Sequence, residues 1–219
     1  MRICDTRTKT ARVCLLGVLL AVSASCRRSA LEPTVELMGA EYDVLSAYVT
    51  DKFAGPGEKL VGKSKVKIVI LNMTQPNDHE LAPLSNGQPV PWTELTKSLL
   101  KDTPDLQPAT VDAYRAANAQ QASLRPVLQS MTDYELVDSE QLDSMFKRNG
   151  GGWPAYYKQH PASQGILTFS RVGFSADGTQ AFLYLSNRCG DLCGGGFYVV
   201  MEKRSGRWAI VREIENSVS

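Results

Sequence analysis

The sequence predicts a single-domain α+β fold, with helices in the first two thirds and an antiparallel β-meander of about four strands at the C-terminus. Four β-rich runs lie between residues 165 and 214, separated by turns such as Asp177-Gly178 and Ser205-Gly206. Apolar residues upstream of these runs recur at helical spacing. The chain of 219 residues is 43% hydrophobic and 21% charged, which is ordinary for one globular domain.

The first 25 residues predict a secretory signal peptide. Basic residues near the start precede an apolar segment, Val13 to Val22, which is too short for a bilayer because a spanning helix needs about 20 residues. Small residues follow at once in Ser23-Ala24-Ser25. We therefore expect residues 1–25 to be removed and the protein to be exported to the cell envelope.

Cys26 directly follows these small residues, and the segment is similar to a bacterial lipoprotein signal. The similarity implies that Cys26 carries a lipid, which would anchor the protein to a membrane surface in the periplasm or at the outer membrane. Residues 26–33 would then be a short membrane-proximal linker, and residues 34–219 the folded domain. Ser23 stands where such signals usually have a larger aliphatic residue, so ordinary cleavage to a soluble secreted protein is the alternative.

The mature chain keeps three cysteines: Cys26, Cys189 and Cys193. If Cys26 is acylated, the other two can pair in an oxidising compartment. Three residues separate them, including Gly190-Asp191, so we expect a disulfide across the tip of a β-hairpin. The alternative is a redox-active dithiol, although such motifs usually have two intervening residues and a helix N-terminus at the first cysteine.

Hydrophobic spacing and helix breakers predict the elements upstream of the meander. Residues 34–53 predict a helix, because apolar residues from Met38 to Phe53 recur every three or four positions. Residues 65–73 predict a strand that joins the sheet, and residues 75–92, with four prolines, predict an irregular loop. Short helices are expected at 93–101, 110–124, 138–148 and 153–160, and a short strand at 134–137.

Charge and motifs argue against several functions. Without residues 1–25 the chain has 20 basic and 22 acidic residues, a net charge of −2, which argues against a nucleic-acid partner. The sequence has neither a phosphate-binding glycine loop nor a nucleophile elbow, and we predict no cofactor. His79 and His160 are the only histidines and lack metal-ligand spacing, so we predict no metal site.

Arg171 is the unusual residue of the meander, because it lies in the middle of a predicted strand. Its guanidinium must reach solvent, a carboxylate or a bound anion, since an unpaired buried charge is prohibitive. One interpretation is an ion pair within the fold. The other is a ligand site in which Arg171, Tyr184 and Arg188 converge on a protein segment or a small anionic ligand.

Three short motifs stand out in the C-terminal part: Ser170 to Phe174 (S-R-V-G-F), Cys189 to Gly194 (C-G-x-x-C-G) and Gly206 to Trp208 (G-x-W). Together they resemble a group of exported bacterial proteins, some of them lipoproteins, over residues 153–219. The resemblance implies export, but it implies no activity because none is known for the group.

Two functions fit these observations. The first is an envelope-anchored binding or interaction module without catalysis, which the lack of a nucleophile–base constellation favours. The second is an envelope enzyme, either a hydrolase that uses His79 or His160 or a thiol oxidoreductase that uses Cys189 and Cys193.

Overall fold

The computed structural model describes residues 35–53, 67–75, 91–128, 133–147 and 151–218, all within one compact unit, Pro33–Ser219. The predicted signal peptide, Cys26, the predicted linker and most of the predicted proline-rich loop, with His79, lie outside these ranges. Across the described ranges, none of the helices combines the length and the apolar character that crossing a membrane requires.

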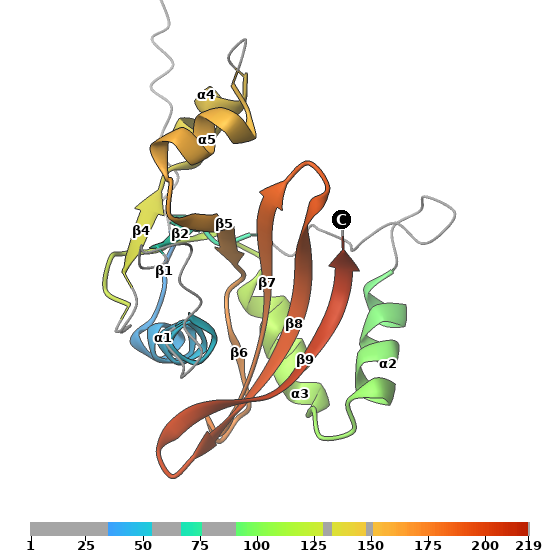
Figure 1. Cartoon of the computed structure of the whole chain (residues 1–219). Helices are drawn as coiled ribbons and strands as arrows, with labels where there is room; N and C mark the ends of the chain where they lie inside the picture. Colours follow the sequence, from blue (N-terminus) through green and yellow to red (C-terminus); the bar gives the residue numbers. More distant parts are fainter. Residues whose placement is uncertain (1–34, 54–66, 76–90, 129–132, 148–150, 219) are drawn as a thin grey trace, which may run out of the picture. The chain divides into compact units, whose positions relative to one another are not determined.

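A seven-stranded mixed sheet forms the centre of the described structure (Figure 1). Its strands follow the order β4 (Tyr134–Val137), β2 (Lys67–Leu71), β5 (Ser163–Phe169), β7 (Gln180–Gly190), β8 (Cys193–Arg204) and β9 (Arg207–Val218), and β6 (Gly173–Phe174) pairs with β7. The β4–β2 and β2–β5 pairs are parallel, and the other pairs are antiparallel.

The four runs predicted at the C-terminus form β5, β7, β8 and β9, and these strands pair antiparallel in that order, but the sheet is larger than this meander and mixed. The sheet continues beyond β5 with β2 and β4, and β2 thus joins the sheet as residues 65–73 predicted. The parallel neighbours of β2 come from distant parts of the chain, with Val69 opposite Ile166 and Ile70 opposite Leu136. Parallel pairing needs a long crossover and no tight turn, so local turn signals could not reveal it.

Five helices lie in the described ranges: α1 (Gly39–Phe53), α2 (Trp92–Asp102), α3 (Pro108–Ala117), α4 (Ser139–Lys147) and α5 (Trp153–Gln159). Helix α3 ends earlier than the predicted 110–124, because Asn118 turns its amide back to donate to the Tyr114 carbonyl oxygen at 2.8 Å. The residues beyond it form β3 (Ala122–Ser123), which pairs in parallel with β1 (Val35–Glu36).

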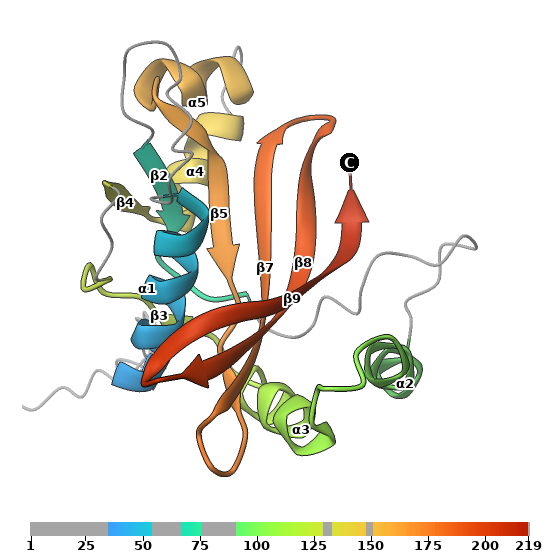
Figure 2. The ribbon, with the colours of Figure 1, turned by 60° about the horizontal axis from the view of Figure 1, so that its bottom comes forward.

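The helices cover both faces of the sheet (Figure 2). Helix α1 packs on one face, where its Leu45 belongs to the same core as Leu183 of β7. Helices α2 and α3 cover Phe182 and Tyr198 on the opposite face, and α4 and α5 cover Val69 of β2. Successive strand residues point to opposite faces, so Phe182 and Leu183 are both fully buried.

Two carboxylates organise local turns. Asp138 precedes α4 and accepts the Glu140 N–H at 2.7 Å, as the predicted helix start at this residue requires. Asp177 lies in the turn between β6 and β7 and accepts the Ser175 hydroxyl at 2.6 Å and the Thr179 hydroxyl at 2.8 Å. The backbone N–H of Glu140 lowers the pKa of Asp138, and the Ser175 hydroxyl lowers that of Asp177.

These lowered pKa values predict a loss of stability in acid. A carboxylate with a lowered pKa in the fold contributes stability above its ordinary pKa of 3.8, and this contribution disappears as the pH falls below it. We expect the urea midpoint to drop between pH 5 and pH 3, and to drop less in an Asp138→Asn/Asp177→Asn double variant. An equal drop in both proteins would assign the acid sensitivity to other groups.

Candidate ligand-binding site

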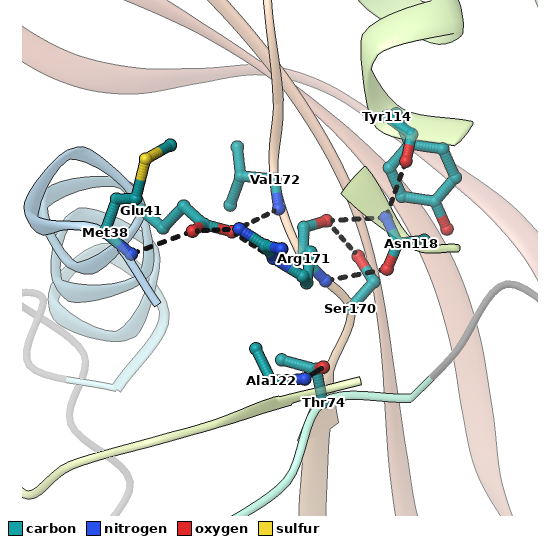
Figure 3. A network of polar contacts seen from close by, with 9 residues as sticks. All are labelled: Met38, Glu41, Thr74, Tyr114, Asn118, Ala122, Ser170, Arg171 and Val172. Carbon is teal, nitrogen blue, oxygen red and sulfur yellow. Dashed lines mark hydrogen bonds and ion pairs between the residues drawn. The ribbon is translucent and has the colours of Figure 1, made fainter. Parts of the chain in front are cut away.

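Arg171 lies in the connection between β5 and β6 and is held by Glu41 of α1 (Figure 3). Its Nε and Nη2 donate to the two carboxylate oxygens at 3.2 and 3.0 Å. Glu41 is completely buried, and Arg171 has only 12% of its side chain exposed. The structure thus places Arg171 in an ion pair within the fold, the first of its two predicted interpretations.

The Glu41 carboxylate also ties α1 to the backbone around it. It accepts the N–H of Met38, one turn back at the helix start, and the N–H of Val172 (Figure 3). From the other side, Asn118 accepts the Arg171 N–H at 2.8 Å and donates to its carbonyl oxygen at 3.1 Å. Side chains from α1 and from the end of α3 therefore hold the β5–β6 connection, where regular strand pairing is interrupted.

The side chains of Tyr184 and Arg188 lie in different parts of the fold from the side chain of Arg171. Tyr184 belongs to the core beneath α2 and α3, with its ring 5.1 Å from that of Tyr198. Arg188 is exposed near the end of β7 and pairs through its backbone with Ile166. The guanidinium of Arg171 instead turns toward α1, so the contacts described do not bring the three side chains together.

A disulfide joins Cys189 and Cys193 at the tip of the β7–β8 hairpin, as predicted, with the two Cα atoms 5.0 Å apart. The Tyr157 hydroxyl of α5 donates to the Cys189 carbonyl oxygen at 2.8 Å and fixes the base of this tip. Leu192, at the turn, is 89% exposed. The bond thus closes a very short loop within one hairpin.

Removing this disulfide is expected to cost little stability. Chain entropy assigns about 2 kcal/mol to so short a loop, so a Cys189→Ser/Cys193→Ser variant should unfold at a slightly lower urea concentration. We also expect the bond to resist glutathione, as structural disulfides do. Rapid reduction by glutathione, with no stability lost in the variant, would favour the thiol oxidoreductase.

His160 is buried, at 3% exposure, at the C-terminal end of α5. Its Nδ1 lies 3.4 Å from Glu135 of β4, and its ring lies 4.9 Å from that of Tyr156. Lys67, by its hydrogen bond, and then His160 lower the pKa of Glu135. The other ring nitrogen, Nε2, is buried without a hydrogen-bond partner among the described residues.

This arrangement resembles two members of a catalytic triad without a nucleophile. Ser163 lies nearby in sequence, but its hydroxyl contacts the hydroxyl of Tyr156 and the carbonyl oxygen of Gly165 at 2.7 Å each. Burial raises the pKa of Tyr156 to about 12, so this hydroxyl stays protonated. The described ranges also contain no group of three or more His, Cys, Asp or Glu residues placed to hold a metal ion.

A groove of about 530 Å³ lies between α1 and the β8–β9 hairpin. Its size falls within the usual range for small-ligand sites. The α1 wall carries Asp43, Ser46, Ala47, Thr50 and Asp51, and the hairpin wall carries Lys203, Gly206, Arg207 and Trp208.

Local structure explains both walls. The α1 residues are spaced by three, one, three and one positions, so they share one face of the helix. The hairpin turns at Ser205 and Gly206, with φ of 50° and 80°, and Arg204 pairs with Arg207 across it. Two successive residues with positive φ are typical of a tight type I′ turn, and they lie at Ser205-Gly206, where the sequence predicted a turn.

The groove is the part of the site that sequence reasoning missed. A polar stripe on α1 was visible in Asp43, Ser46, Thr50 and Asp51, but polar residues along one side of a helix are ordinary. What makes them a site is the β8–β9 turn opposite, which lies more than 150 residues away in the chain.

Comparisons with known proteins identify no relative: no family model, curated protein or solved structure matches this chain.

Proposed function

We propose that this protein is an exported envelope protein, anchored by a lipid on Cys26, that binds a small ligand without catalysing a reaction. The groove between α1 and the β8–β9 hairpin is the observation that carries the proposal. It offers hydroxyl groups, charges of both signs and the indole of Trp208 on two firmly held elements. Export and anchoring rest on the N-terminal sequence.

Two contacts keep the groove in shape. Glu213 of β9 accepts hydrogen bonds from Tyr48 and Lys52, which lie on α1 beside the groove-lining residues. The ion pair of Glu41 with Arg171 holds the other end of the same helix. A site built on fixed elements loses little entropy when a ligand binds, which favours a binding role.

Ligand binding is tested on the lipid-bearing protein purified from the envelope in detergent. A library of charged small molecules is screened by thermal shift on wild type and on Thr50→Trp, which fills the groove. Ala40→Trp places the same side chain on an exposed part of α1 outside the groove and serves as the control. We expect hits that bind wild type and Ala40→Trp and lose binding in Thr50→Trp; hits unaffected by Thr50→Trp would contradict the proposal.

Anchoring is tested separately by palmitate labelling. Wild type should incorporate the label and fractionate with membranes, whereas Cys26→Ser should do neither. Equal membrane fractionation of both proteins would reject Cys26 as the anchor.

The hydrolase alternative rests on the Glu135–His160 contact alone. A His160→Gln variant that keeps full activity in a functional assay of the host cell would remove His160 from it, and His79→Gln tests the other histidine in the same way.

A further inference from the structure

The two walls of the groove carry charges of opposite sign. Asp43 and Asp51 stand on the α1 wall, eight residues and therefore about 12 Å apart along the helix. Lys203 and Arg207 stand on the hairpin wall. A small ligand in the groove would therefore meet carboxylates on one side and cations on the other.

These four charges do not pair with one another. Elsewhere in the described structure, oppositely charged neighbours form ion pairs, such as Lys52 with Glu213 and Arg204 with Glu202. Across the groove, no such pair with nitrogen and oxygen within 4.0 Å occurs between the described residues. These charged groups therefore form no ion pair with one another, and a ligand between the walls can contact both.

A ligand with one sign of charge would be attracted by one wall and repelled by the other. A zwitterion with its charges at opposite ends meets attraction at both walls. The partly buried indole of Trp208 adds an apolar surface at the hairpin, and Lys203 lies over its ring at 5.6 Å. This combination suits a ligand with an ammonium group, an apolar middle and an anionic group.

The geometry points to a short peptide with both termini charged. Its ammonium group faces the α1 wall at Asp51, its carboxylate faces Lys203 and Arg207 on the hairpin wall, and an apolar side chain packs on Trp208. This inference rests on the proposed function and names its ligand class. A zwitterionic lipid headgroup such as phosphocholine shares the two charges but holds them only a few bonds apart, which fits two separated walls less well.

The test uses the tripeptide Ala-Leu-Ala and calorimetry on the lipid-bearing protein in detergent. Four forms are compared: both termini charged, N-acetylated, C-amidated and doubly blocked. Because hydrogen bonds to charged groups are the stronger ones, we expect each single block to weaken binding at least about fivefold and the double block to abolish it. Equal binding of all four forms, or binding of phosphocholine alone, would overturn the inference.

Variants then test the orientation. Asp51→Asn should weaken the peptide with a charged N-terminus but leave the N-acetylated peptide unchanged. Arg207→Gln should weaken the peptide with a charged C-terminus but leave the C-amidated peptide unchanged. Arg204→Gln is the control, because Arg204 pairs with Glu202 and does not line the groove. If a variant weakened the binding of charged and blocked peptides equally, the proposed orientation would be overturned.

Failure of the inference is distinguishable from failure of the proposed function. If none of the peptides binds but other molecules bind wild type and not Thr50→Trp, the peptide is wrong and the groove remains a binding site. If nothing binds in the groove, both are wrong.

Discussion

Replacing Glu41 with alanine is expected to destabilise the protein by about 3–5 kcal/mol, the usual cost of removing one partner of a buried ion pair. The Glu41 carboxylate is fully buried and accepts hydrogen bonds from Arg171 and from the N–H groups of Met38 and Val172. Alanine would leave the guanidinium and both backbone donors without this acceptor. Urea unfolding followed by circular dichroism measures the loss.

An exposed ion pair provides the matched control. Lys147 and Asp143 pair four residues apart on α4, with 75% and 63% of their side chains exposed. Asp143→Ala should therefore change the free energy of unfolding by no more than about 0.5 kcal/mol. The contrast between the two variants separates burial from charge pairing as such.

A double variant tests how much of the stabilisation by Glu41 comes from its ion pair with Arg171 and how much from its hydrogen bonds to the backbone. Glu41→Leu with Arg171→Met removes both charges and keeps apolar volume, so it should recover part of the stability lost in Glu41→Ala. Recovery stays incomplete because Met38 and Val172 keep donors without that acceptor. If Arg171→Ala alone cost less than about 1 kcal/mol, the ion pair would not explain the position of Arg171, and its ligand-binding interpretation would return.

The sequence identified Arg171 as a residue that needs a partner, but it could not identify Glu41, which lies 130 residues away. One local signal was available. Glu41 lies one turn before Leu45 and two turns before Tyr48, both buried, so it falls on the buried stripe of α1. A carboxylate on such a stripe requires a cation or several donors, and α1 carries no cation within two turns of Glu41.

In the sheet too, pairs of strands that are adjacent in the sequence could be predicted, whereas pairs of distant strands could not. The hairpins from β7 to β9 were predictable because each joins adjacent strands through a turn with its own residue preferences. The β1–β3 and β2–β4 pairs join strands from different parts of the chain, and the sequence of one strand does not indicate which other strand it pairs with. The groove likewise lies between α1 and the β8–β9 hairpin, which are far apart in the sequence.

Replacing Gly173 with alanine is expected to destabilise the protein by about 3 kcal/mol, at the upper end of the usual cost of overpacking. A Cβ atom at Gly173 would lie 2.3 Å from the Tyr114 nitrogen and 2.4 Å from its Cα. Real Cβ atoms do not approach this closely, so α3 would have to move away from β6. Urea unfolding measures the loss, and near-ultraviolet circular dichroism should report the displaced Tyr114 ring.

The clash involves the backbone of Tyr114, so shortening its side chain would not relieve it. The displacement would reach the core beneath α3, because the Tyr114 ring lies 5.0 Å from Phe182 and 5.9 Å from Trp92. Gly39→Ala is the matched control, since a Cβ there meets nothing within 4 Å and alanine favours the helix that begins at this residue. We expect Gly39→Ala to be neutral or slightly stabilising; equal losses in both variants would contradict the close packing of α3 on β6.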